Sequence, residues 1–71
     1  MAELTTQAFG ERVKKKREEL GITIRKLTGM VEIDQSVISR YEAGKQFPSV
    51  PSLVKLADAL GVTTDWLLGR G

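Results

Sequence analysis

Apolar residues recur along the chain at spacings of three and four, which is typical of helices that bury one face against a core. Glycines at positions 21, 44 and 61 each follow such a segment, where a helix end favours a residue that tolerates positive φ. No apolar–polar alternation is long enough to predict a strand. The pattern predicts helices at residues 6–20, 24–31, 35–43, 50–60 and 64–68. We therefore expect an all-α, five-helix fold in which residues 1–71 form a single domain.

The predicted helix starts coincide with residues that cap helices. Thr23, Asp34, Ser49 and Thr63 each precede a helical segment, and their side-chain oxygens can accept hydrogen bonds from backbone N–H groups of the first turn. Pro51 falls in the first turn of the segment at 50–60, where a missing N–H is tolerated. Local chemistry and periodicity therefore predict the same helix starts.

Only residues 32–34 separate the second and third predicted helices. So short a connection makes the two helices cross steeply, which is the arrangement of a helix-turn-helix unit. The pair cannot bury its apolar side alone, so the other three helices must cover it. In the first helix Phe9, Val13 and Leu20 share a face. The rest of the predicted core is Leu27, Val31, Ile33, Ile38, Leu53, Leu56, Leu60, Val62, Trp66 and Leu67.

The segment at 35–43 carries a band of hydrogen-bonding side chains beside its apolar side. The band comprises Gln35, Ser36, Ser39 and Arg40. A DNA major groove, about 12 Å wide, admits one helix, and there Arg pairs with guanine, Gln with adenine and Ser with several partners. Gln35 or Ser36 alone would fit a solvated helix surface better. Their clustering on the second helix of a tight pair favours base recognition.

The composition excludes several classes of site. The 71 residues include no cysteine and no histidine, which removes disulfides, thiolate metal sites, the commonest general base and the commonest transition-metal ligand. Glu18 and Glu19 are adjacent acids, but no histidine or metal-binding cluster accompanies them. We therefore expect a protein that is not an enzyme and that has no catalytic residues, metal or cofactor.

The N-terminal residues do not resemble a signal peptide. No apolar run approaches the roughly 20 residues that a membrane span requires. A cytoplasmic location without a membrane partner is the resulting expectation.

The net charge of +2 is modest, but the charges are unevenly distributed. Residues 12–45 contain nine Lys or Arg against five Asp or Glu, a net of +4, whereas the remaining residues contain two against four, a net of −2. A surface that faces phosphates produces this kind of asymmetry. Solvated helices with scattered lysines would produce it too, so charge alone leaves both interpretations open.

Several short motifs occur in an order that is typical of one protein family. They are FGERV near the start, LGIT before the second helix, SVISRYEAGK in the third, and LVKLADALGVTTDWLLG near the end. From residue 9 to residue 68 the chain resembles the DNA-binding domain of the phage repressor and Cro family, also called the XRE family. The resemblance implies a sequence-specific regulator of transcription that binds double-stranded DNA, with a repressor as the leading expectation.

The resemblance also assigns contacts to individual residues. The implied base contacts are Gln35, Ser36, Ser39 and Arg40, and the implied phosphate contacts are Thr23, Arg25, Lys45, Gln46 and Ser49. Thr23 and Arg25 are substitutes, because Ile24 stands where the family has a phosphate-contacting Gln. Arg17 and Glu42 match a partly buried ion pair between the first and third helices, which we expect to be structural.

The second helix departs from the family pattern in other ways. Thr28 stands where a small Ala normally allows close helix packing, and Glu32 occupies a turn position usually held by Gly. Gly29, inside the helix, costs about 1 kcal/mol relative to Ala. These departures indicate that the second helix docks less tightly or that its surface has another role.

The resemblance further implies a homodimer on a palindromic operator, with recognition helices about 34 Å apart. The implied dimer contact is formed by Val62, Thr63, Trp66 and Leu67. Core packing remains the favoured role of Trp66. The sequence leaves open whether this is a small complete regulator or the N-terminal half of a longer repressor.

The altered second helix keeps one alternative function open. The same fold could serve as a protein-interaction module, with an antirepressor or a toxin as its partner and weak or no DNA binding. Salt dependence separates the two functions, because DNA binding releases counterions and weakens steeply as salt rises.

Overall fold

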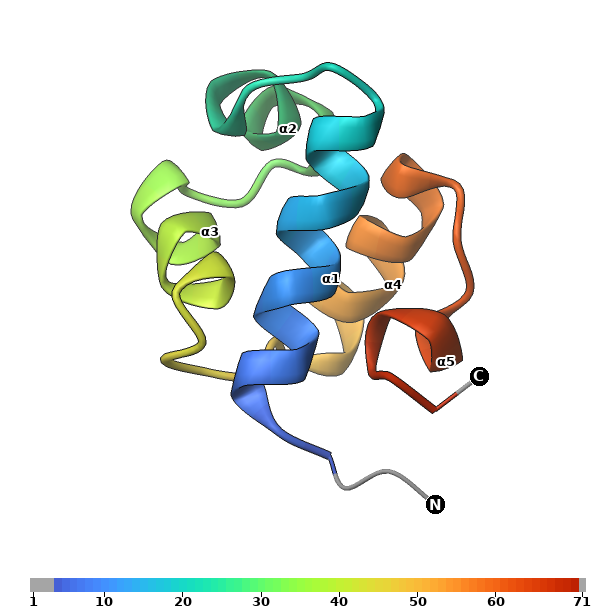
Figure 1. Ribbon diagram of the computed structural model, residues 1–71. Coiled ribbons are helices and arrows are strands. Elements are labelled where there is room, and N and C mark those ends of the chain that lie inside the picture. The colour runs from blue at the N-terminus through green and yellow to red at the C-terminus, as the bar shows by residue number, and fades with distance from the viewer. Residues whose placement is uncertain (1–3, 71) are drawn as a thin grey trace.

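The computed structural model describes residues 4–70, and these residues form helices without any strand (Figure 1). The helices are α1 (Thr6–Glu19), α2 (Ile24–Val31), α3 (Gln35–Glu42), α4 (Val50–Leu60) and α5 (Thr64–Leu67). Each helix begins at the predicted residue, and α1, α3 and α5 end one residue earlier than predicted. The all-α prediction is confirmed for the described residues.

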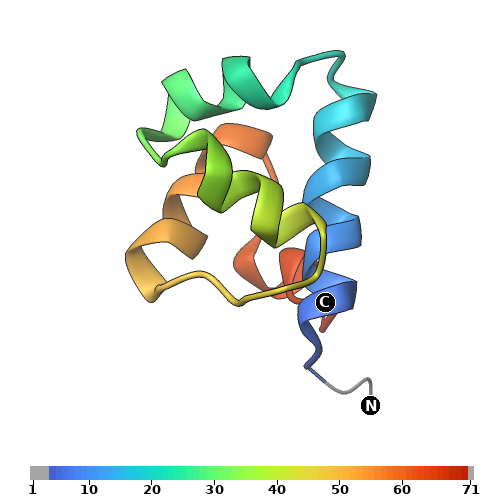
Figure 2. The same cartoon turned by 90° about the vertical axis from the view of Figure 1, so that its left-hand side faces the viewer.

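Helix α1 is the central element of the fold. It packs against α3, α4 and α5, whereas α2 packs against α3 and α4. In Figure 1, α3 lies on one side of α1 and α4 and α5 lie on the other, with α2 near the C-terminal end of α1. Figure 2 shows α3 at the front of the molecule, and no other described element covers its outer side. The second helix of the predicted helix-turn-helix therefore faces outward.

Three of the four predicted side-chain caps are present. Thr23, Ser49 and Thr63 cap α2, α4 and α5, and each oxygen accepts a hydrogen bond of 3.0–3.3 Å from a backbone N–H. These bonds satisfy N–H groups that have no partner inside the helix. The helix starts therefore follow from local chemistry, as the sequence predicts.

The predicted side-chain cap at Asp34 is wrong. The N–H groups of Val37 and Ile38 donate instead to the backbone carbonyl of Asp34, at 3.0 and 3.1 Å. With these donors already satisfied, the Asp34 carboxylate accepts a hydrogen bond from the Ser36 hydroxyl. Asp34 occupies the cap position but orients a neighbouring side chain.

The core lies between α1 and the other helices. Its buried apolar residues are Phe9, Val13, Leu27, Val31, Ile38, Tyr41, Leu56, Ala57, Leu60 and Leu67. Four predicted core residues, Ile33, Leu53, Val62 and Trp66, are half-buried and pack at its edge. Tyr41 lies on the side of α3 that the helical pattern predicts to be buried, whereas Ala57 joins the core without having been predicted there.

Leu20 does not share the buried face predicted for Phe9 and Val13. It follows the last turn of α1 as the C-cap and is 48% exposed. The next residue, Gly21, has a φ of +70°, so the chain leaves the helix before Leu20 can reach the core. The predicted helix end was one residue too late, and Leu20 was misplaced with it.

Helices α1 and α3 approach each other closely at Gly10. A Cβ atom on Gly10 would lie 2.1 Å from the carbonyl oxygen of Tyr41 and 3.1 Å from that of Glu42. Beside this contact, the rings of Phe9 and Tyr41 meet edge to face, with centroids 5.5 Å apart and an interplanar angle of 73°. Only a residue without a side chain permits this backbone approach.

Two residues, one in α2 and one in the turn after it, have features that lower the stability of the fold locally. Glu32 has a φ of +56° and is the one non-glycine among residues 4–70 with positive φ. The Thr28 hydroxyl oxygen is buried and has no hydrogen-bond partner in the described chain. An unpaired buried hydroxyl costs about 1–3 kcal/mol. Thr28 is thus a source of local instability in this protein.

Replacing Gly10 with Ala is expected to lower the free energy of unfolding by about 1–3 kcal/mol or more, because the added methyl group meets the Tyr41 carbonyl and separates α1 from α3. Gly29→Ala is the matched control. A Cβ at Gly29 meets nothing within 4 Å, and this change should stabilise the helix by about 1 kcal/mol. Urea denaturation followed by circular dichroism measures both, and effects of the same sign would contradict the assigned contact.

Replacing Thr28 with Val is expected to raise the free energy of unfolding by about 1 kcal/mol, because it removes the unpaired hydroxyl while keeping the side-chain shape. The same substitution at Thr23 removes a helix cap and should lower stability by about 1 kcal/mol. Thermal unfolding of the two variants gives the comparison. A less stable Thr28→Val protein would show that this hydroxyl has a partner.

Candidate nucleic-acid interface

The outer side of α3 carries all the predicted base-contacting residues. Gln35, Ser36, Ser39 and Arg40 are exposed, whereas Ile38 on the same helix is fully buried. The four exposed side chains supply an amide, two hydroxyls and a guanidinium, all of which can hydrogen-bond to base edges. No other described element covers the outer side of α3 (Figure 2).

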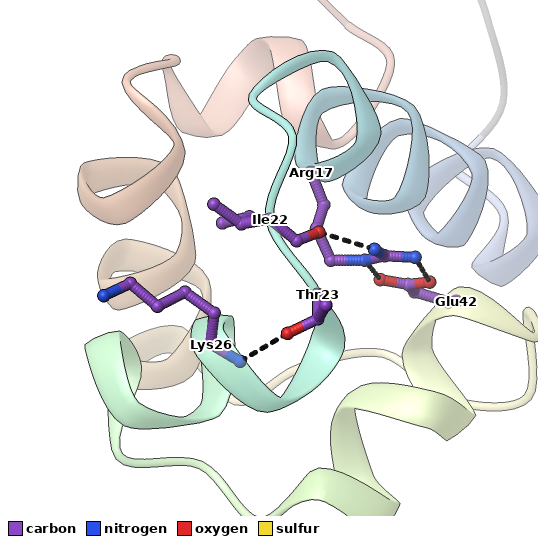
Figure 3. Close-up of polar contacts among 5 residues, drawn as sticks. All are labelled: Arg17, Ile22, Thr23, Lys26 and Glu42. Carbon is purple, nitrogen blue, oxygen red and sulfur yellow. Dashed lines mark hydrogen bonds and ion pairs between the residues drawn. The ribbon is translucent and has the colours of Figure 1, made fainter.

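An ion pair between Arg17 and Glu42 fixes α3 against α1 (Figure 3). Arg17 Nε donates to Glu42 Oε2 at 2.7 Å, and Nη2 donates to Oε1 at 3.0 Å. Nη1 donates to the carbonyl oxygen of Ile22 at 2.8 Å, in the connection between α1 and α2. One guanidinium therefore joins α1, the following loop and α3. The predicted structural pair is present.

The setting of Arg17 is that of a structural cation. The side chains of Arg17 and Glu42 are only 12% and 7% exposed. Hydrogen bonding to Glu42 raises the pKa of Arg17 above its ordinary value, although burial acts in the opposite direction. A raised folded pKa gives stability that is present below the ordinary value and lost only as pH rises through the folded value. Arg17 therefore stays charged and paired throughout the neutral range.

The bond from Ser36 to Asp34 determines how Ser36 can act as a ligand. Because the Ser36 hydroxyl donates its proton to the Asp34 carboxylate, only its oxygen lone pairs remain available. Those lone pairs fit an amino group, which adenine and cytosine present in the major groove. No motif or spacing in the sequence indicates this restriction.

Arg40 is held by the loop that follows its own helix. Its Nε donates to Oε1 of Gln46 at 3.0 Å, and its carbonyl oxygen accepts from the Lys45 N–H, also at 3.0 Å. Gln46, predicted as a phosphate contact, therefore also contacts a predicted base-contacting side chain. No periodicity or motif could indicate this contact, because it depends on the path of the chain around Gly44.

The predicted phosphate contacts come from segments that border α3. Thr23 and Arg25 lie at the start of α2, and Lys45 lies in the loop after α3; all three are exposed. The exposed Ser49 starts α4, and its hydroxyl is hydrogen-bonded to Ser52 Oγ at 3.0 Å. In Figure 2, α2 lies above α3 and the loop lies below it. The segments that carry Thr23, Arg25 and Lys45 therefore lie on either side of α3.

The predicted dimer contact is only partly available at the surface. Leu67 is fully buried in the core, so it is not available to contact a second chain. Trp66 is half-buried, and the guanidinium of Arg12 lies 5.2 Å from its ring centroid. Val62 is half-buried and Thr63 is exposed. Leu67 was assigned to both the core and the contact, and the structure places it in the core.

The structure exposes large apolar side chains that the sequence did not single out. Phe47 lies in the loop after α3 and is 45% exposed. Val50, the first residue of α4, is 75% exposed, and Val54 lies one turn further along that helix. The helical spacing of apolar residues does not distinguish these exposed side chains from buried ones, so periodicity did not identify them.

Residues 4–70 contain no group of three or more acidic side chains placed to hold a metal ion. None of the helices in this part of the chain combines the length and apolar content needed to cross a membrane.

The chain is similar to proteins of one family. A helix-turn-helix family model (HTH_3) matches residues 13–67. The SPbeta prophage-derived HTH-type transcriptional regulator YonR of Bacillus subtilis is 40% identical over 60 residues, which cover 84% of this chain and 56% of YonR. The chain spans about half the length of the curated relatives it matches.

Solved structures of similar shape include proteins bound to DNA. The P22 c2 repressor in complex with a synthetic operator has a TM-score of 0.84 and 32% identity, covering 89% of this chain and 96% of that chain. SinR of Bacillus subtilis in complex with DNA has a TM-score of 0.80 and 31% identity, covering 84% and 97% of the two chains.

Replacing Glu42 with Ala is expected to lower the free energy of unfolding by about 3–5 kcal/mol, because it leaves the Arg17 charge buried without its partner. Arg17→Lys should cost less, since it keeps the charge and loses only the planar fork. Glu19→Ala is the surface control, because Glu19 pairs with Lys16 at 3.5 Å in an exposed setting worth about 0–1 kcal/mol. If the first two changes had equal and negligible effects, the ion pair would not contribute to the stability of the fold.

Proposed function

The chain belongs to the helix-turn-helix family whose model it matches, and on that premise we propose that it is a sequence-specific, double-stranded DNA-binding transcriptional regulator that acts as a repressor. Helix α3 enters the major groove of the operator. The observation that carries this proposal is the division of α3 into a buried apolar side and an exposed side of hydrogen-bonding groups.

The roles of individual residues follow from their chemistry and position. On α3, Arg40 pairs with a guanine, Gln35 with an adenine, and Ser36 accepts from a base amino group. Ser39 contacts the neighbouring base edge. Around this helix the exposed cations Arg25 and Lys45 contact phosphates. The phosphate contacts position the protein on the duplex, and the base contacts provide the specificity.

The starts of two helices supply further phosphate contacts. The backbone N–H groups at the N-terminus of a helix favour an anion. The capping residues Thr23 and Ser49 lie at the starts of α2 and α4. Ile24 takes no part in phosphate binding, because its half-buried side chain packs against the core. The α2 terminus thus replaces the missing Gln of the family by backbone chemistry.

Two copies of the chain bind one palindromic operator. One domain of this size contacts too few bases for tight, specific binding, whereas two recognition helices about 34 Å apart reach successive major grooves on one face of the duplex. Val62, Thr63 and Trp66 remain as the proposed contact between the copies. The P22 c2 repressor, a similar chain, has been solved with an operator, which supports the DNA part of this proposal.

Replacing Arg40 with Ala is expected to cost about 1–3 kcal/mol of operator binding and to relax the preference at one base pair, because a bidentate base contact is lost. Replacing Lys45 with Ala should weaken binding to all duplexes by similar amounts and reduce the salt slope by about 1. Operators selected from a random duplex pool, titrated by fluorescence anisotropy at several salt concentrations, provide the measurement.

The same titrations test the proposed function itself. Steep weakening of binding with rising salt is expected, because each neutralised phosphate releases counterions. If the Arg40 and Lys45 variants bind every duplex as the parent does, α3 is not the recognition helix. A parent that enriches no duplex at all would favour the protein-interaction alternative.

A further inference from the structure

Gln46 and Arg40 form a contact that links the loop after α3 to the proposed base-reading surface. We propose that Gln46 is a positioning residue, which holds the Arg40 guanidinium so that its two terminal nitrogens face a guanine. This inference rests on the proposed function and adds the means by which one base pair of the operator is specified.

The chemistry of the two side chains fixes the direction of the contact. Arg40 Nε carries a hydrogen and has no acceptor capacity, so the Gln46 atom at 3.0 Å must be the carbonyl oxygen of its amide. The Gln46 NH₂ group then points elsewhere and keeps both of its donors. It remains free to contact a phosphate, as predicted, while the carbonyl oxygen holds Arg40.

The loop that carries Gln46 contacts both α3 and α1. Gly44, with a φ of +74°, turns the chain, and the Lys45 N–H closes the turn on the Arg40 carbonyl oxygen. A Cβ on Gly44 would lie 3.1 Å from Gln7 Cα, so the turn packs directly against the first turn of α1. Arg40 is therefore bound to this loop through both its backbone and its side chain.

The contact limits how Arg40 can pair with a base. A guanidinium can offer either Nε with one terminal nitrogen or the two terminal nitrogens together. Because Nε is already bonded to Gln46, only the two terminal nitrogens remain as a fork. Guanine presents O6 and N7 as adjacent acceptors, which match such a fork. The structure thus assigns a G·C pair to the position that Arg40 reads.

Because the Arg40 side chain is oriented before DNA binds, it has less side-chain freedom to lose when it pairs with a base. An unrestrained Arg loses side-chain freedom when it pairs with a base, at about 0.5–1.5 kcal/mol for a long side chain, equivalent to roughly a twofold to tenfold change in affinity. That loss arises only on duplexes where the pair forms. Removing the Gln46 contact should therefore reduce discrimination at one base pair and leave the other positions unchanged.

The test compares the parent with Gln46→Met and Gln46→Glu on a set of duplexes in which each operator base pair is varied singly. Gln46→Met removes the acceptor at similar length and should reduce the preference for guanine at the Arg40 position by roughly twofold to tenfold. Gln46→Glu keeps an acceptor for Nε, so it should retain that preference while binding every duplex more weakly through phosphate repulsion. In an Arg40→Ala background, Gln46→Met should have no further effect on base preference.

A second readout is independent of DNA. In the free protein, the Nε–H signal of Arg40 in ¹⁵N-resolved spectra should be protected from solvent exchange and should lose this protection in Gln46→Met. The Nε–H of Arg17, bonded to Glu42 at 2.7 Å, is the internal reference and should be unchanged.

The outcomes separate this inference from the proposed function. A parent that selects a defined operator, while Gln46→Met weakens all duplexes equally, would overturn the positioning role and leave Gln46 as a phosphate contact only. An unchanged base preference in Gln46→Met would overturn it as well. A parent that selects no duplex would refute the proposed function, and the inference with it.

Discussion

The contact between α1 and α3 is the constraint on which the exposed face of α3 depends. At one end of α3 the chain passes close to Gly10, where a side chain would meet the Tyr41 carbonyl oxygen. At the same end Glu42 is paired with Arg17, whose guanidinium also binds the Ile22 carbonyl oxygen. Because short helices gain most of their stability from packing, an eight-residue helix cannot hold a fixed direction alone. The α1–α3 contact supplies that direction and leaves the polar side of α3 outward.

The buried ion pair strengthens the contact between α1 and α3, and it also favours one placement of α3 over others. A charge with so little exposure is costly unless it is paired and hydrogen-bonded, and each of the three nitrogens of the Arg17 guanidinium donates one hydrogen bond. A displaced α3 would leave both charges buried and unpaired. The pair therefore penalises alternative placements of α3 more severely than apolar packing alone would, since apolar contacts have no preferred direction.

The sequence predicted those features that depend on local chemistry and failed where the path of the chain decides. Helix starts at Thr23, Ser49 and Thr63 were predicted because a capping hydroxyl acts within one turn. The cap at Asp34 failed because the Val37 N–H, which a capping side chain would bind, donates to the backbone carbonyl of Asp34. The Arg17–Glu42 pair was predicted only through family resemblance, since no spacing rule relates residues 25 positions apart. The contact between Arg40 and Gln46 had no signal of either kind.

The recognition surface is already partly organised in the free protein. Ser36 is tied to Asp34 and Arg40 to Gln46, so two of the four exposed polar side chains of α3 have their donors directed before any ligand is present. Restricted side chains bind with a smaller loss of freedom, and they reject ligands whose groups do not match the fixed donors and acceptors. Gln35 and Ser39 have no such tether among the described hydrogen bonds and can adjust to more than one base. Specificity should therefore be unequal along α3: Arg40 favours guanine, Ser36 favours the two bases that present an amino group, and the other two positions are more tolerant.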